Sequence, residues 1–126
     1  MRQLRERIAT ADILIANARA RAFEQIGLAP HIVFDLNPRL VWVAITGYGW
    51  SGPGASRIGF GDDTAAAGGL LRWTSAGQPR FLGDALADPL TGLAAAAATL
   101  AALEQGGGQL VDAALARTPA VIAALN

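Results

Sequence analysis

The 126-residue sequence contains no cysteine, no lysine and a single histidine, His31. Without cysteine the chain can form no disulfide and has no thiol nucleophile, and a structural zinc site would lack its usual ligands. Its ten basic residues, all arginine, balance ten acidic residues. A net charge of zero argues against a protein that binds nucleic acid or another polyanion, because neutralising phosphates needs a cationic excess.

Long apolar runs are also lacking. The first seven residues, MRQLRER, are charged and lead into no apolar segment of the kind found in a secretory signal peptide. The longest apolar stretch, residues 93–103, is well short of the ~20 residues that a membrane span needs. We therefore expect a soluble, cytoplasmic protein with no membrane partner.

What the sequence does contain is an alternation of β-branched runs and helical spacing, which indicates an α/β fold. The clearest strand is residues 40–46, LVWVAIT, which is apolar almost throughout. Such a strand is typical of a parallel sheet covered on both faces. Shorter strands are predicted at residues 12–16, expected to be buried, and 109–113. Because 28 residues are alanine, the 52% apolar content overstates the supply of large core side chains.

Helices are predicted from apolar spacing and from capping residues. The expected ranges are residues 1–10, 18–26, 32–36, 65–71, 89–105 and 114–125. Gly27 is suited to end the second helix, Asp62-Asp63-Thr64 to begin the fourth, and the glycines at 106–108 to end the fifth. Residues 47–61 form a predicted loop, and residues 72–83 could form a small hairpin. No internal repeat or linker divides the chain, so residues 1–126 are expected to belong to one domain.

Residues 47–52, GYGWSG, fit the G-x-G-x-x-G pattern of dinucleotide-binding proteins and follow a good strand. That site also needs the glycines to open a helix whose amides hold the pyrophosphate. Here Pro53 and Gly54 come next, and the following helix signal waits until Asp62. A loop that needs glycine for its turns is the better interpretation, with a small nucleotide-binding α/β domain kept as an alternative.

Two other patterns are weak as catalytic or metal sites. Ser51 has glycine two residues before it but Pro53 two residues after it, so it does not form a nucleophile elbow, and only His31 could act as its base. The pair Asp62-Asp63 could bind a metal, but it has no histidine nearby, and capping is the simpler role.

Asp88 is the strongest candidate for chemistry. It precedes Pro89, and Asp at the N-cap followed by Pro is a preferred helix start. The helix dipole would keep such a carboxylate ionised at neutral pH, where it can attack an activated acyl group. Asp84 lies four residues upstream in the same glycine-containing approach. From position alone, a purely capping role for Asp88 remains open.

Five segments resemble the family III CoA-transferases, in the same order along the chain. Residues 11–17 (ADILIAN) and 23–28 (FEQIGL) resemble the family segment ADVxIENFRPG…LERLGL, and residues 37–49 (NPRLVWVAITGYG) resemble NPRLIYxSISGFG. Residues 51–53 (SGP) correspond to TGP in the family, and residues 107–115 (GGQLVDAAL) to GxGQxVDVSL. Residues 85–92 (ALADPLTG) correspond to the family segment that contains the catalytic aspartate. Each match is short, but five collinear matches over nearly the whole chain are specific.

This family includes formyl-CoA and carnitine CoA-transferases and α-methylacyl-CoA racemases. The resemblance implies an α/β fold, part of a Rossmann-like large domain with short parallel strands and Ala-rich helices. It implies transfer of CoA between carboxylic acids, with Asp88 attacking the acyl-CoA and then carrying CoA as a thioester. It also implies that Asn17, Gly47 and Tyr48 contact CoA, which is a substrate, with no metal and no permanently bound cofactor.

Three departures from the family pattern bear on this reading. Residues 16–21, ANARAR, lack the glutamate, phenylalanine, proline and glycine of the family block. Gln25 occupies a position that is often an arginine binding the CoA phosphates. Phe60-Gly61 stands where racemases carry a histidine-aspartate pair, which argues against racemase chemistry because an acid/base is needed on each face of the α-carbon.

Length is the largest departure, because family members are roughly three times as long and form interlocked homodimers. The chain therefore corresponds to the central part of a family member. It is expected to be a fragment, a split subunit needing the missing segments, or a truncated homologue that has lost activity. We expect it to work as a homodimer or with a complementary subunit, and to self-associate alone, since its Ala-rich helix and the Trp42 strand would find too few large partners. The alternative from another class is a non-catalytic scaffold or interaction module that retains the fold.

Overall fold

A three-stranded parallel sheet forms the centre of the computed structural model, which describes residues 1–125. The strands are β1 (Ile13–Ala16), β2 (Val41–Thr46) and β5 (Gln109–Ala114), in the order β1-β2-β5. In the middle strand, Trp42 is in register with Leu14 of β1 and Leu110 of β5. The three predicted strands and the α/β fold are confirmed.

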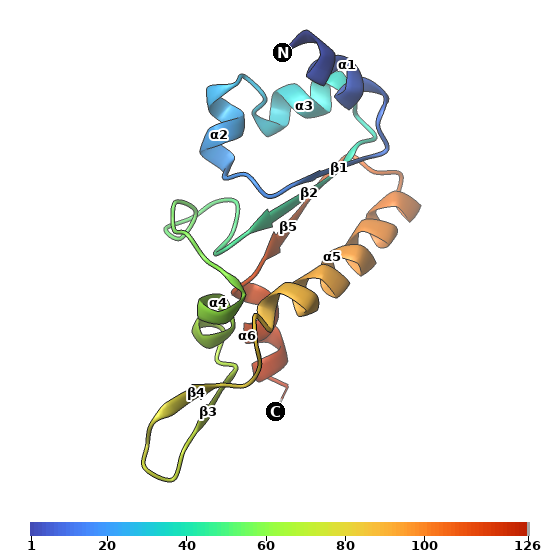
Figure 1. The fold of residues 1–126 in the computed structure, drawn as a ribbon. Helices are drawn as coiled ribbons and strands as arrows, with labels where there is room; N and C mark the ends of the chain where they lie inside the picture. Colours follow the sequence, from blue (N-terminus) through green and yellow to red (C-terminus); the bar gives the residue numbers. More distant parts are fainter. Residues whose placement is uncertain (126) are drawn as a thin grey trace.

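Helices cover both faces of this sheet, as Figure 1 shows. On one side lie α1 (Arg2–Thr10), α2 (Ala20–Gln25) and α3 (Pro30–Leu36), and on the other lies the longest helix, α5 (Ala87–Glu104). The short helices α4 (Gly61–Ala67) and α6 (Arg117–Ala123) lie beyond the ends of β2 and β5, beside the first turn of α5.

Side chains of β2 alternate between the two halves of the core. Leu40, Trp42 and Ala44 pack with α1 and α3, whereas Val41 and Val43 pack with α5 and β5. This two-sided burial is what the apolar sequence of the strand predicted.

Trp42 is fully buried inside this single chain. Its ring meets those of Phe23 and Trp50 edge-on, with centroid distances of 4.7 and 5.0 Å. Edge-to-face aromatic pairs stabilise a core beyond the area that they bury. The expectation that the Trp42 strand lacks large partners was therefore wrong, because Phe23 and Trp50 reach it from segments outside the strand.

The expectation of burial was also wrong for β1. It is an edge strand, and Ile15 is 67% exposed. Helix α5 packs against β2 and β5, which leaves Ile13 and Ile15 partly uncovered on that face of the sheet.

Two helices begin earlier than the sequence suggested. Helix α4 begins at Gly61, so the Asp62-Asp63-Thr64 cluster lies in its first turn, and Asp63 caps the helix by accepting the Phe60 N–H at 2.6 Å. Helix α5 begins at Ala87, with Leu86 at the N-cap, so the prediction that Asp88 is the N-cap was wrong. The turn closes sooner because the N–H of Asp88 already donates to the carbonyl of Ala85.

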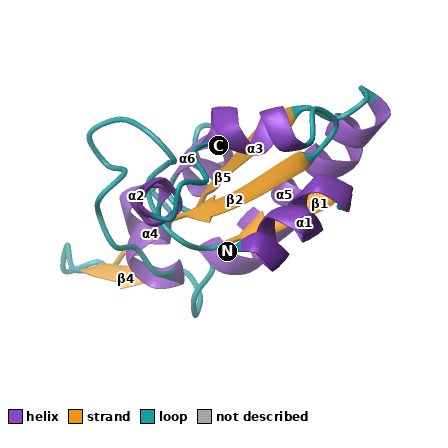
Figure 2. Cartoon of the chain, turned by 90° about the horizontal axis from the view of Figure 1, so that it is seen from above, coloured by secondary structure: helices purple, strands orange, loops and turns teal. Residues whose placement is uncertain are grey.

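The end of α5 and the hairpin lie where the turn residues of the sequence predicted them. The glycines at 106–108 all adopt positive φ and end α5, as predicted. Strands β3 (Leu71–Trp73) and β4 (Pro79–Phe81) form the expected hairpin, which projects away from the sheet (Figure 1 and Figure 2). The last helix starts three residues later than expected because β5 extends to Ala114. Within residues 1–125, no helix has the length and apolar character to cross a membrane.

Candidate functional site

The C-terminal ends of the three strands meet at one edge of the sheet, because the strands are parallel. Ligands of open α/β sheets bind at this edge. Asn17 follows β1, Gly47 follows β2 and Leu115 follows β5, while the first turn of α5 brings Asp88 to the same edge (Figure 1). These four residues line one hollow of about 460 Å³, called the central hollow below.

Asp88 presents an exposed carboxylate to this hollow. Among residues 1–125 its side chain has no hydrogen-bond or ion-pair partner, so its oxygens are available to a ligand. It stands in the first turn of an 18-residue helix, where the helix dipole favours a negative charge. The group is thus suited to act as an anionic nucleophile.

The turn that carries Asp88 is held by α4. Asp62 Oδ1 accepts the N–H of Ala85 at 2.6 Å, and Ala85 has the unusual φ of +45°. The carbonyl of Ala85 then accepts the N–H of Asp88 at 3.0 Å. Gly61 packs so closely here that a Cβ atom on it would overlap Oδ2 of Asp88. Gly61 and Asp62 therefore fix the position of Asp88, a role that the sequence did not suggest because the bonded residues are 23 positions apart.

Tyr48 does not line the central hollow. Its O–H donates to Asp63 Oδ2 at 3.0 Å, and the guanidinium of Arg57 lies 4.4 Å from the centre of its ring. Burial raises the pKa of the Tyr48 phenol, and its hydrogen bond to Asp63 raises it further. The phenol is thus protonated at neutral pH and holds the loop after β2 to α4, while Arg57 itself faces the hollow.

Asp112 of β5 anchors the other side of that loop. Its Oδ1 accepts the Thr46 hydroxyl at 3.1 Å and the N–H of Trp50 at 3.0 Å, and its Oδ2 accepts from Arg117 at 3.1 Å. Thr46 in turn accepts the N–H of Gly49 at 3.0 Å. No local pattern in the sequence indicated this role of Asp112, although the residue lies in the family-like GGQLVDAAL segment.

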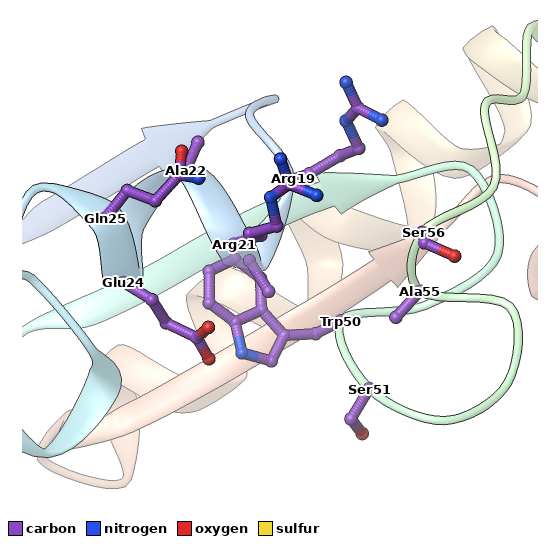
Figure 3. Close-up of a pocket in the computed structure, with 10 residues that line it drawn as sticks. Arg19, Arg21, Ala22, Glu24, Gln25, Trp50, Ser51, Ala55 and Ser56 are labelled. Atoms are coloured by element: carbon purple, nitrogen blue, oxygen red, sulfur yellow. The ribbon is translucent and has the colours of Figure 1, made fainter.

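A second hollow of about 480 Å³, called the arginine hollow, adjoins the central one, and Arg19 and Ala55 line both. Figure 3 shows its two walls: one holds Arg19, Arg21 and neighbouring residues up to Gln25, and the other holds the loop that contains Ala55. The indole of Trp50 reaches from the loop toward α2. Neither Arg19 nor Arg21 takes part in an ion pair within residues 1–125, so two cationic groups here are free to meet an anion.

A third and smaller hollow of about 180 Å³, called the α5 hollow, lies along the first turns of that helix. Ile45, Asp88 and Leu115 line both it and the central hollow. The three hollows therefore adjoin in the order arginine hollow, central hollow and α5 hollow. The free arginines lie at one end of this series and a mainly apolar lining at the other, and Asp88 lies between the central hollow and the α5 hollow.

The structure does not assemble the dinucleotide-binding site of the G-x-G-x-x-G pattern, nor does it place Ser51 and His31 in one site. The glycines of residues 47–52 open no helix, because α4 starts only at Gly61. A dinucleotide site of the G-x-G-x-x-G type therefore lacks its helix N-terminus. Ser51 lines the arginine hollow, whereas His31 lies in α3 and lines none of the three hollows. No group of three or more acidic or histidine side chains in residues 1–125 could hold a metal ion.

Three comparisons relate the chain to known proteins. The family model described as CoA-transferase family III matches residues 1–125. An acyl-CoA transferase of Fusarium pseudograminearum is 38% identical over 117 residues, covering 88% of this chain and 26% of that protein. The succinyl-CoA–L-malate CoA-transferase beta subunit of Chloroflexus aurantiacus is 39% identical over 121 residues, covering 90% and 30%.

Solved structures agree with this relationship. The crystal structure of a CAIB/BAIF family protein from Brucella suis superposes with a TM-score of 0.86 and 32% identity, covering 98% of this chain and 34% of that one. The chain therefore spans about a third or less of the length of the relatives that it matches.

Proposed function

The chain belongs to CoA-transferase family III, and from this premise we propose that it forms part of an enzyme that moves CoA from an acyl-CoA to a carboxylic acid through a covalent intermediate on Asp88. The observation that carries the proposal is the meeting of Asn17, Gly47 and Asp88 in one hollow at the C-terminal edge of the sheet. The resemblance to the family implies that Asn17 and Gly47 bind CoA and that Asp88 is catalytic.

The proposed reaction has four exchanges, each an acyl-transfer step that makes or breaks a bond to the carboxyl group of Asp88. Asp88 attacks the carbonyl of the donor acyl-CoA, which gives an aspartyl anhydride and CoA thiolate. The thiolate attacks the aspartyl carbonyl and releases the donor acid, leaving an aspartyl-CoA thioester. The acceptor carboxylate attacks this thioester and frees the thiolate again. The thiolate then attacks the acceptor carbonyl, so that acyl-CoA leaves and the Asp88 carboxylate is restored.

We infer that CoA lies along the series of hollows with its nucleotide in the arginine hollow. Arg19, Arg21 and Trp50 line that hollow together with Glu24, so its lining carries two cations, one carboxylate and an aromatic face. The two cations and the aromatic face suit phosphates and an adenine ring. Gln25 also lines it, at a family position that is often arginine. The two free arginines can therefore replace the charge that Gln25 lacks. The thioester end would then reach Asp88 through the central hollow.

This arrangement makes a prediction for Arg19, which lines both hollows. We expect Arg19→Gln to weaken CoA binding by about ten- to a hundredfold, because a charge-assisted contact to a phosphate contributes roughly 1.5–3 kcal/mol. Binding of pantetheine, which has no phosphate, should change little. Isothermal titration calorimetry with both ligands measures the two effects.

Arg72→Gln serves as the matched control, because Arg72 is an exposed arginine of the projecting β3–β4 hairpin and lines none of the hollows. This control should leave both affinities unchanged. An equal loss of CoA and pantetheine affinity in Arg19→Gln would instead mean that its guanidinium does not act through the phosphates.

The length of the relatives bears on how such an enzyme would be assembled. Since the chain covers 26–30% of the curated relatives, we propose that residues 1–126 are one part of a family III domain and that further segments complete the site. A non-catalytic interaction module is the competing proposal, and the same coverage supports it. Covalent labelling of Asp88, described in the Discussion, distinguishes the two.

We also propose that the chain self-associates through the outer face of α5. Residues 89–103 contain no charged side chain, and Leu93 and Leu100 on this helix are 73% and 63% exposed. An exposed apolar helix face of this kind commonly marks an interface. We expect sedimentation velocity to show concentration-dependent dimers for the wild type and monomers for a Leu93→Glu, Leu100→Glu variant.

Val121→Glu is the control for this experiment, since Val121 is 58% exposed on α6 rather than α5. It should leave the dimer intact. A wild-type chain that sediments as a monomer at all concentrations would refute self-association and leave a complementary subunit as the partner to seek.

A further inference from the structure

The loop after β2 contributes to both of the hollows that we assign to CoA. Its first residue, Gly47, lines the central hollow, whereas Trp50 and Ser51 line the arginine hollow. Only Tyr48 and Gly49 lie between these two parts of the loop. The direction that the backbone takes over these two residues therefore decides where one wall of the arginine hollow lies.

Backbone hydrogen bonds hold the first part of the loop. The N–H of Leu115 donates to the carbonyl of Thr46 at 2.8 Å, and the N–H of Ala116 donates to the carbonyl of Gly47 at 2.9 Å. These bonds extend the pairing of β2 with β5 and need no particular side chain. The wall of the central hollow at Gly47 is thus held whichever side chains β5 carries.

Side-chain hydrogen bonds hold the second part of the loop, and they converge on Asp112. Its Oδ1 accepts the N–H of Trp50 at 3.0 Å and the hydroxyl of Thr46 at 3.1 Å. The same hydroxyl accepts the N–H of Gly49 at 3.0 Å. The Asp112 side chain is only 20% exposed, so water does not readily replace these bonds. Two successive backbone N–H groups therefore depend, directly or through Thr46, on one carboxylate.

Gly49 lets the backbone pass close to this carboxylate. Its φ is +114°, and a Cβ atom there would lie 3.4 Å from Oδ2 of Asp112. Glycine adopts such a φ without strain, whereas other residues rarely do. The turn is thus built for a close approach to Asp112.

We infer that Asp112 is a positioning residue for the nucleotide end of CoA, because its carboxylate fixes the backbone at residues 49 and 50 and so places the Trp50 indole in the arginine hollow. The inference rests on the proposed function, since it assumes that the nucleotide binds there. The rings of Trp42 and Phe23 also contact the indole, with centroid distances of 5.0 and 5.9 Å. These contacts act on the ring, whereas Asp112 holds the backbone from which the ring extends.

The test measures the affinities of Asp112→Ala for CoA and pantetheine by isothermal titration calorimetry. We expect CoA binding to weaken at least about fivefold, as loss of one stacked base does. Pantetheine binding should stay unchanged, because the central hollow keeps its backbone hydrogen bonds. Loss of a negative charge would by itself strengthen phosphate binding, so the expected loss has the opposite sign to the charge effect.

Asp35→Ala is the matched control. Asp35 is an exposed carboxylate on α3 that lines none of the three hollows. Its removal changes the net charge by the same amount as Asp112→Ala and should leave both affinities unchanged.

A double-mutant cycle tests whether Asp112 acts through Trp50. Trp50→Leu keeps an apolar side chain against Trp42 but offers no ring on which a base can stack. Adding Asp112→Ala to Trp50→Leu should weaken CoA binding by less than about a further twofold, whereas independent effects would multiply. Asp112→Val fills a similar space and suits a strand, so it provides a second variant should Asp112→Ala fold poorly, and it should give the same results.

Fluorescence reports the position of Trp50 without any ligand. The chain has three tryptophans, of which Trp42 is fully buried and Trp73, on the projecting hairpin, is 66% exposed. In a Trp73→Phe background, quenching by acrylamide therefore reports mainly on Trp50. We expect Asp112→Ala to increase this quenching, because the indole leaves its place against Trp42.

The outcomes separate this inference from the proposed function. If the wild type binds CoA, an unchanged CoA affinity in Asp112→Ala, an equal loss of pantetheine affinity, or losses that multiply in the cycle would overturn the inference alone. If the wild type binds no CoA but Asp112→Ala exposes Trp50 to acrylamide, the placement of Trp50 by Asp112 stands and the proposed CoA function falls. If the wild type binds no CoA and the quenching is unchanged, both are refuted.

Discussion

Replacing Asp88 with asparagine is expected to abolish covalent labelling of the chain by acyl-CoA and to lower CoA transfer by at least about a thousandfold, as loss of a nucleophile does in other enzymes. An amide has no anionic oxygen to attack the thioester, so no anhydride forms. Hydroxylamine converts an acylated aspartate to a stable hydroxamate, and mass spectrometry of the digested protein locates that adduct. The labelling needs only the first exchange of the reaction, so it can be sought in this chain without full turnover.

The fold should survive this substitution. The Asp88 carboxylate is exposed and has no hydrogen-bond or ion-pair partner in residues 1–125, so asparagine leaves no partner unpaired. The far-ultraviolet circular dichroism spectrum should therefore be unchanged. Asp84→Asn is the matched control, since Asp84 is an exposed carboxylate four residues upstream that lines none of the three hollows. It should be labelled like the wild type.

Two results would count against Asp88 as the acyl acceptor. The first is an adduct on another residue that persists in Asp88→Asn. The second is the absence of any adduct in the wild type with short and long acyl-CoAs, which would favour the non-catalytic module.

The largest loss of stability is expected from Gly107→Ala. Gly107 has φ +77°, and a Cβ atom there would overlap the backbone carbonyl of Arg39. A backbone carbonyl cannot rotate away as a side chain does, so the turn between α5 and β5 would have to shift. Strain in the left-handed region and overpacking together should lower the free energy of unfolding by about 3 kcal/mol or more. The midpoint of urea denaturation measures this change.

Gly106→Ala separates the two causes. Gly106 has φ +94°, but a Cβ atom there would meet nothing within 4 Å. This variant carries the backbone strain alone and should lose only about 1–2 kcal/mol. Equal losses in the two variants would show that the approach to Arg39 does not constrain the turn.

The segments that could be predicted from the sequence are those with local causes. β2 was identified because its residues are apolar almost throughout, and the end of α5 because three consecutive glycines can adopt positive φ. The start of α5 was misjudged by two residues, because the unusual conformation of Ala85 depends on a bond to Asp62 from a distant part of the chain.

The candidate site was predicted in part for a similar reason. Asp88, Asn17 and Gly47 stand in family-like segments, and topology alone brings segments after parallel strands to one edge. The contact of Tyr48 with CoA stays a prediction, and the structure adds that its hydroxyl donates to Asp63. Nothing local to residue 48 indicated that partner, which lies 15 residues away.

By itself, the sequence determined the family and the α/β alternation, and it made Asp88 the proposed nucleophile, since motifs, periodicity and capping residues act over a few positions. Only the tertiary structure decided that Gly61 and Asp62 hold Asp88 and that Arg19 faces two hollows. These features depend on contacts between residues far apart in the chain, and the order of the residues does not reveal such contacts until the helices and strands have packed together.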